Sequence, residues 1–208
     1  MKIVFFGDSI TDMARSRDCD GKAFGYGVGY VNSVASTLKY ENPEAYEIIN
    51  RGNSGHRIVD LYARVKADVW NHNPDVISIL IGINDVWHEI YGGNGVDIVR
   101  FEKVYRMLLE DTKNQLPNVK FILCEPFVLK GTATEEKYDA FCEVKKYAAV
   151  VKKLAEEFSA PFVALQDKFD EAAAKHGAAH YLYDGVHPDI AGGKLIAEEW
   201  LKVFKTHF

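Results

Sequence analysis

The stretch KIVFFGDS, residues 2–9, decides the fold of this chain. Ile3 to Phe6 are β-branched or aromatic, which favours a strand, and a continuous apolar run is typical of a strand buried on both faces. The run stops at Gly7, where a sharp turn is allowed. We therefore predict a buried strand over 2–6 that ends in a turn bearing Asp8 and Ser9.

Four similar runs follow this strand, and helical patterns separate them. The later strands are predicted at 47–50, 75–81, 119–123 and, more weakly, 161–164. Between them, apolar residues recur with a period near 3.6 over 30–38, 58–65, 101–112, 144–158 and 190–204. Alternation of strand and helix predicts an α/β fold, with a parallel sheet covered by helices on both faces.

Composition and charge limit the function classes. The chain has 208 residues, 48% hydrophobic and 26% charged, which predicts one globular domain over residues 1–208. Its 25 basic and 30 acidic residues give a net charge of −5 and a pI of about 5.8. These values exclude a nucleic-acid binder that relies on bulk positive charge, and they argue against general binding to anionic membranes.

The cysteines and the first residues indicate a compartment. Cys19, Cys124 and Cys142 are odd in number and form no CxxC pair, so neither a disulfide framework nor a zinc knuckle is indicated. Met1 and Lys2 lead straight into the first strand, and the apolar run is too short for a signal peptide or a membrane span. We therefore expect a cytoplasmic protein.

Polar motifs follow the predicted strands at their carboxyl ends, where open α/β sheets bind ligands. They are GDSITD at 7–12, NRGNSG at 50–55 and GIND at 82–85, with DGVHP at 184–188 before the last helix. Together they offer a serine, a glycine-rich turn, an asparagine and an Asp-x-x-His. Acyl transfer needs such a set: a nucleophile, a base, a residue that orients the base, and oxyanion donors.

In order and placement, these four motifs resemble the blocks of the SGNH (GDSL) hydrolase family across nearly the whole chain. The resemblance implies a flavodoxin-like, three-layer α/β/α fold with a five-stranded parallel sheet. It also implies that Ser9 is the nucleophile, that Gly55 and Asn84 belong to the oxyanion hole, and that Asp184 and His187 complete the triad. No block residue is missing.

A narrower match concerns GKAFGYGVGYV at 21–31, GINDVW at 82–87 and GVHP at 185–188. These stretches are similar to the acetylxylan esterase branch of the family. The similarity implies a small-molecule acetylated carbohydrate as substrate, and often a homo-oligomer. Related deacetylases of other sugars share much of this pattern.

Elementary chemistry supports the same roles. A serine hydroxyl is a weak nucleophile without a base, and His187 can supply one while Asp184 fixes its tautomer. The backbone N–H groups of Ser9 and Gly55 and the side chain of Asn84 can stabilise an oxyanion. This mechanism requires no cofactor and no metal.

The remaining candidates have two interpretations each. Asp8, Trp87 and Tyr183 are predicted to bind substrate, but Asp8 can instead hold the serine turn, and the rings, like those of Tyr91 and Tyr181, can simply pack. Arg15 and Arg17 are cleft or interface residues, or they belong to the solvated surface.

Among the other histidines, only His56 and His88 follow strand-end motifs and are candidates for the cleft. The spacing of the histidines predicts no metal site. Gly25-x-Gly27-x-Gly29 lacks the spacing of a dinucleotide loop.

Two rival functions stay open at this stage. A lysophospholipase or thioesterase of the same family would need an apolar groove for a long acyl chain. A binding module for small ligands would use the same sheet edge without chemistry, although the complete Ser9, Asp184 and His187 set argues against it.

Overall fold

The computed structural model describes residues 1–208 and shows one five-stranded parallel sheet. The strands are β1 (Lys2–Gly7), β2 (Glu47–Gly52), β3 (Val76–Leu80), β4 (Lys120–Cys124) and β5 (Phe162–Val163), in the order β2-β1-β3-β4-β5. The first residues of β2 and β4 are exposed and those of β1 and β5 are partly buried, whereas all other strand residues are buried. Apolar runs without alternation predict such burial.

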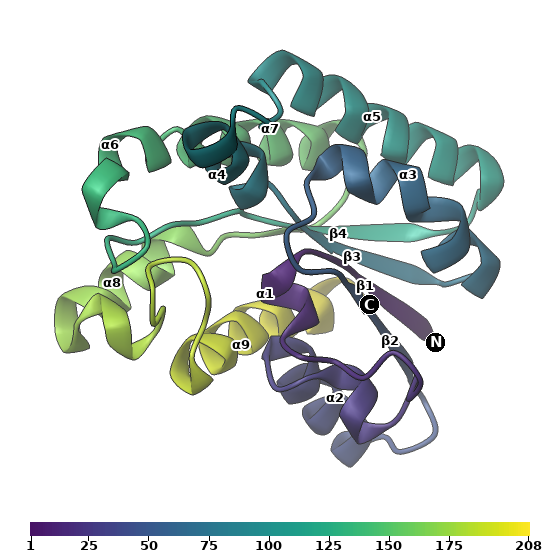
Figure 1. The fold of residues 1–208 in the computed structure, drawn as a ribbon. Coiled ribbons are helices and arrows are strands. Elements are labelled where there is room, and N and C mark those ends of the chain that lie inside the picture. Colours follow the sequence, from purple (N-terminus) through teal and green to yellow (C-terminus); the bar gives the residue numbers. More distant parts are fainter.

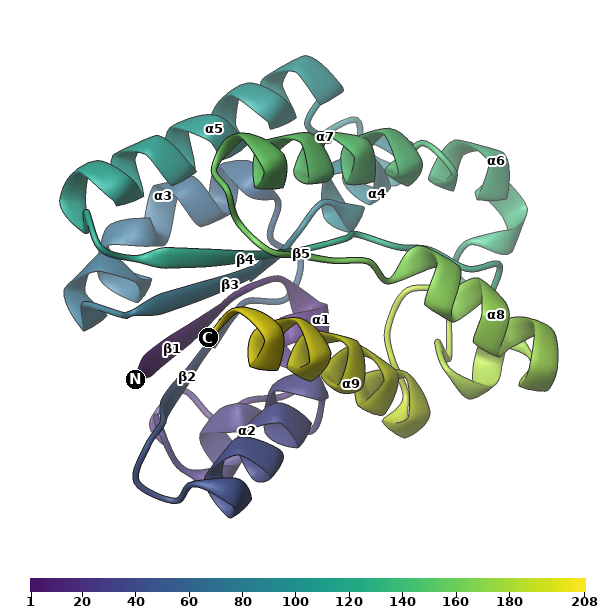
Figure 2. The ribbon, with the colours of Figure 1, turned by 180° about the vertical axis from the view of Figure 1, so that it is seen from behind.

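Helices cover both faces of this sheet, as Figures 1 and 2 show. On one side α3 packs against α5 and α5 against α7, while on the other side α2 packs against α9. The predicted α/β architecture is confirmed. The helices are α1 (Ser9–Asp12), α2 (Tyr30–Glu41), α3 (Ile58–Asp68), α4 (Ile83–Gly92), α5 (Ile98–Gln115), α6 (Tyr138–Phe141), α7 (Val144–Glu157), α8 (Gln166–His176) and α9 (Ile190–His207).

Some elements were not expected from the sequence. The periodic pattern did not indicate α4, α6 or α8, of which α6 is a single turn and α8 buries only Phe169 fully. Because α6 and α8 offer no long apolar face, the helical period of apolar residues does not reveal them in the sequence. None of the helices is long and apolar enough to cross a membrane.

The strand register brings the first motifs to one level. Gly7 of β1 pairs with Gly52 of β2 and with Leu80 of β3. The segments that follow these three strands therefore start side by side at the carboxyl edge of the sheet. This edge is the site predicted for ligands in open α/β sheets.

Candidate active site

Ser9 lies at the N-terminal end of α1, directly beyond β1. The side chain of Asp8 caps this short helix, because its Oδ1 accepts a hydrogen bond of 2.9 Å from the N–H of Ile10. The cap fixes the turn in which Ser9 stands. The first N–H groups of a helix favour negative charge, so the serine stands where an oxyanion is stabilised.

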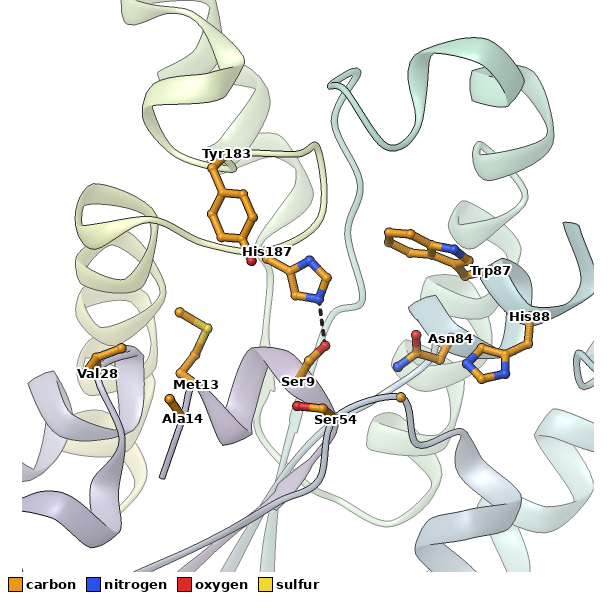
Figure 3. Close-up of a pocket in the computed structure, with 11 residues that line it drawn as sticks. Ser9, Met13, Ala14, Val28, Ser54, Asn84, Trp87, His88, Tyr183 and His187 are labelled. Carbon is orange, nitrogen blue, oxygen red and sulfur yellow. Dashed lines mark hydrogen bonds between the residues drawn. The ribbon is translucent and has the colours of Figure 1, made fainter. Parts of the chain in front are cut away.

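The structure joins Ser9, His187 and Asp184 in one chain of hydrogen bonds. Ser9 Oγ lies 2.8 Å from His187 Nε2, and His187 Nδ1 lies 2.7 Å from Asp184 Oδ2. Figure 3 shows the imidazole above the serine hydroxyl. A carboxylate accepts and does not donate, so Nδ1 carries the proton and Nε2 is free to take one from Ser9.

A tight turn holds the histidine in place. Asp184 Oδ1 accepts hydrogen bonds from the N–H groups of Val186 and His187, at 2.9 and 2.8 Å. Gly185 has φ +99°, and a Cβ there would lie 2.6 Å from the carbonyl oxygen of Leu129. Position 185 therefore requires glycine. The Asp184 carboxylate accepts hydrogen bonds from both the backbone of the turn and the imidazole.

The electrostatics of the pair suit a general base. Burial alone would lower the pKa of His187, but the hydrogen bond and charge of Asp184, with the charge of Asp8, raise it above the ordinary value. Burial would raise the pKa of Asp184, yet its bonds from the imidazole and the two backbone N–H groups lower it. Asp184 is thus held in its ionised form, which is able to stabilise an imidazolium at His187.

Three groups around Ser9 are available to an oxyanion. The N–H groups of Ser9 and Gly55 have no acceptor within the protein. Gly55 adopts φ +81° with open space where a side chain would stand. Asn84 Nδ2 donates to the carbonyl oxygen of His56 at 3.1 Å, which orients the amide and leaves its second hydrogen free.

A cavity of about 480 Å³ opens over the serine. In Figure 3, Asn84, Trp87 and His88 lie on one side of Ser9, and Met13, Ala14 and Val28 on the other. Its lining contains no lysine, arginine, aspartate or glutamate: Ser9, Met13, Ala14, Val28, Ser54, Gly55, Asn84, Trp87, His88, Tyr183 and His187. Histidines are thus the only side chains in the lining that can carry a charge near neutral pH.

The lining includes residues that the sequence did not single out. Met13 and Ala14 have φ +36° and +59°, a left-handed conformation that non-glycine residues rarely adopt. This bend after α1 turns both residues along the cavity. Nothing in the local sequence signals it, whereas Ser54 could have been proposed from its place beside Gly55.

The structure corrects the expectation for Asp8. Its side chain is fully buried and does not line the cavity, so it does not contact a substrate there. Its Oδ2 has no partner, and neither has Oδ2 of the buried Asp85. Burial outweighs the bond from Ile10 and the charge of His187, and it raises the pKa of Asp8 to about 7.

Trp87 and Tyr183 line the cavity as expected of substrate-binding residues, and the Tyr183 ring stacks on His187 with centroids 5.7 Å apart. Tyr91 and Tyr181 do not line it. His88 belongs to the lining, but His56 is held by Arg64.

Arg15 and Arg17 are neither cleft residues nor simply solvated. Both donate to the carbonyl oxygen of Gly52, at 2.9 and 3.1 Å, and so tie the segment after α1 to the end of β2. No group of three or more His, Cys, Asp or Glu side chains is arranged to hold a metal ion.

Comparison with known proteins agrees with this geometry. The sequence model of the GDSL-like lipase/acylhydrolase family matches residues 5–195. The chain belongs to this family. A GDSL-family protein is a carboxylic ester hydrolase, and this GDSL hydrolase is 36% identical to an acetylxylan esterase from Geobacillus stearothermophilus, over 97% of this chain and 92% of the relative.

Solved structures of similar proteins have the same fold as this GDSL hydrolase. A GDSL-like lipase from Parabacteroides merdae superposes with a TM-score of 0.92 at 38% identity, covering 98% of this chain and 95% of the other. The Geobacillus acetylxylan esterase superposes with a TM-score of 0.87, covering 97% and 92%. Three structures of that esterase carry substitutions described as catalytic, of a serine, an aspartate and a histidine.

Proposed function

We propose that this hydrolase removes acetyl groups from neutral carbohydrates, such as acetylated xylo-oligosaccharides, through an acyl-enzyme on Ser9. The observation that carries the proposal is the hydrogen-bonded chain from Ser9 through His187 to Asp184, open to an uncharged cavity. A partly buried relay of this kind has a chemical use only if an electrophile reaches Ser9 Oγ.

The reaction proceeds in two halves. Ser9 Oγ attacks the ester carbonyl while His187 Nε2 takes its proton, and the oxyanion accepts hydrogen bonds from the N–H groups of Ser9 and Gly55 and from Asn84 Nδ2. His187 returns the proton to the sugar oxygen, which leaves. Water then gives a proton to His187 and attacks the acetyl-enzyme. His187 passes this proton to Ser9 Oγ as the acyl bond breaks, which releases acetate and regenerates free Ser9.

The cavity favours a neutral alcohol. A phosphate headgroup or coenzyme A would call for lysine or arginine side chains, and the lining has neither. Trp87 and Tyr183 offer aromatic faces suited to sugar rings. The Geobacillus relative is named for acetylxylan, and a 25% identical yeast relative, from Saccharomyces cerevisiae, is named for isoamyl acetate. Both names contain an acetyl ester, which supports acetyl as the acyl group.

One observation favours a second candidate. Met13, Ala14 and Val28 form an apolar wall that could hold a longer acyl chain, as a lysophospholipase or thioesterase would need. A non-catalytic binding module of the same fold would leave the relay of Ser9 and His187 without a use.

The test is acetate release from acetylated xylo-oligosaccharides, other acetylated sugars and lysophospholipid, with wild-type protein and Ser9→Ala side by side. Acetate from the sugars that requires Ser9 supports the proposal. Release of fatty acid from lysophospholipid, without acetate from any sugar, would replace this proposal by the lysophospholipase candidate. No turnover of any ester overturns the assignment of an active esterase.

The homo-oligomer and the cytoplasmic location stay predictions. Light scattering of the purified protein would test the first, because it gives the molar mass in solution. Fractionation of the source cells would test the second.

A further inference from the structure

The three oxyanion donors come from three different segments. Ser9 follows β1, Gly55 follows β2, and Asn84 stands in the first turn of α4 after β3. Donors act on a transition state only when their positions are fixed beforehand, to within about 0.5 Å. Direct bonds join these segments in part: the N–H of Asn53 donates to the carbonyl oxygen of Gly7 at 3.0 Å, and the N–H of Ser54 donates to Asp12 Oδ2 at 3.1 Å. A buried side chain that bonds to several segments at once adds to these connections.

The side chain of Arg64, in the middle of α3, contacts two of these segments at once. Its Nη2 donates to the carbonyl oxygen of Gly7 at 2.9 Å, two residues before the nucleophile. Its Nη1 donates to the carbonyl oxygen of Arg51 at 2.8 Å, at the end of β2. Its Nε donates to Nδ1 of His56 at 3.0 Å, directly after the oxyanion glycine.

The guanidinium is itself held in one position. Asp68, one turn along α3, accepts from Nη1 at 2.6 Å, and the guanidinium carbon lies 4.4 Å from the centre of the Phe6 ring. The side chain of Arg64 is only 13% exposed. A planar group with diverging donors can reach several acceptors at once, which a lysine ammonium on its flexible stem cannot do in this geometry.

His56 extends the connection to the third segment. Its carbonyl oxygen accepts from Asn84 Nδ2 at 3.1 Å, while its ring accepts from Arg64. The ring can accept at Nδ1 only when that nitrogen is unprotonated. Burial, followed by the charge of Arg64, lowers the pKa of His56 and so keeps the ring neutral.

We propose that Arg64 is a positioning residue for ester hydrolysis: through His56, its guanidinium fixes the distances between Ser9, Gly55 and Asn84. Arg64 does not line the cavity and touches no substrate. The inference rests on the proposed function, because it takes these three residues as the oxyanion donors. A residue that only stabilised the fold would lower the amount of active protein and leave the turnover of each folded molecule unchanged.

The experiment compares four variants on p-nitrophenyl acetate. Arg64→Lys keeps the charge but cannot make the three diverging bonds, and His56→Leu removes the acceptor. His56→Asn restores it, because Asn Oδ1 stands at the same bond separation from the backbone as His Nδ1. Arg57→Met is the matched control. The side chain of Arg57 is similarly buried, at 16% exposed, and pairs with a carboxylate at the N-terminus of α3, but it bonds to Asp60 and to the carbonyl oxygen of Asn94.

Fluorophosphonate titration of Ser9 gives the concentration of folded sites, so that kcat is measured per active molecule. We expect Arg64→Lys and His56→Leu to lower kcat by roughly 10²-fold with KM within about threefold of wild type, the pattern of a contact needed only in the transition state. His56→Asn should recover most of the lost kcat. Arg57→Met should leave kcat unchanged.

Three results would overturn the inference. These are wild-type kcat per titrated site in Arg64→Lys, an equal loss in His56→Asn and His56→Leu, or a loss that falls on KM alone. If Arg64→Lys does not fold, the two His56 variants decide the question. A wild-type protein that hydrolyses no ester would remove the proposed function and this inference together, whereas an active wild type with unaffected variants would remove the inference alone.

Discussion

Ser9 Oγ and His187 Nε2 lie 2.8 Å apart although 178 residues separate them in the chain. The contact exists because β1 and the turn before α9 both end at the carboxyl edge of the sheet. In the mechanism that we propose, a proton moves between these two atoms.

Ser9→Ala should abolish ester hydrolysis and leave the fold intact. Loss of the serine in a comparable triad lowers kcat by about 10⁶-fold. The matched control is Ser54→Ala, because Ser54 lines the same cavity but its hydroxyl donates to Asp12. Fluorophosphonate labelling should disappear in the first variant and persist in the second. More than a tenth of wild-type activity in Ser9→Ala would show that another nucleophile is used.

The pH profile should follow His187. The base must be neutral to accept a proton, so kcat/KM should rise as the pH rises through its pKa. Because Asp184 and Asp8 together outweigh burial and raise this pKa, the midpoint should lie above the ordinary value for histidine. A profile that stays flat between pH 5 and 8 would exclude His187 as the base.

The variant Asp184→Asn removes the negative charge beside His187 but keeps an acceptor for the backbone N–H groups of the turn. Asparagine keeps an oxygen that can accept from the N–H groups of Val186 and His187, so the turn should survive, but the imidazole loses its anionic partner. We expect kcat to fall by about 10⁴-fold with KM nearly unchanged. The rising limb of any remaining activity should move to lower pH, since the anion that raised the pKa of His187 is gone. A silent variant would contradict the triad.

Acyl-chain length distinguishes the two candidate substrates. Each buried methylene contributes about 0.8 kcal/mol, so a lipid groove would give kcat/KM that increases with chain length. An esterase for acetylated sugars predicts the reverse: acetyl above butyryl, and octanoyl barely hydrolysed. The measurement is kcat/KM on p-nitrophenyl esters of increasing length, and a maximum at octanoyl would favour the lipid candidate.

Asp8→Asn should change how stability depends on pH. The pKa of Asp8 is about 7 in the folded protein and near 3.8 when unfolded. Between these values the folded state holds a proton that the unfolded state has lost, so the stability contributed by Asp8 decreases as the pH rises through this window. Asparagine cannot ionise, so the stability of the variant relative to wild type should increase from pH 4 to pH 7 and then level off.

Urea unfolding at a series of pH values measures this difference. The control is Asp189→Asn, because Asp189 also caps a helix, accepting from the N–H of Ile190, but is exposed. A parallel pH dependence of wild type and Asp8→Asn would show that Asp8 is ionised in the folded state.

The sequence predicted the fold well because its strands are buried on both faces. Such runs are continuous, as over 75–81, and they remain visible without an alignment. Ser9, Asn84 and His187 could also be predicted from the sequence, because each follows a strand or a tight turn in a short motif. The positions of the five strands differ from the prediction by at most two residues at either end.

What the sequence did not predict depends on contacts between distant segments. The bend at Met13 and Ala14 has no local signal, since both residues adopt a conformation that their types disfavour. The burial of Asp8 depends on the layers packed around it, and the role of Arg64 depends on carbonyl groups from two other strands. Such partners are set by the tertiary fold.

The position of β1 inside the sheet has a consequence for synthesis of the protein. Its two neighbours, β2 and β3, leave the ribosome after it, and the turn that bears His187 leaves after all five strands. A nascent chain therefore presents the serine long before it can present the histidine. Fragments that end before this turn lack the base, so enzymatic activity would report on chains that have been synthesised and folded at least as far as this turn.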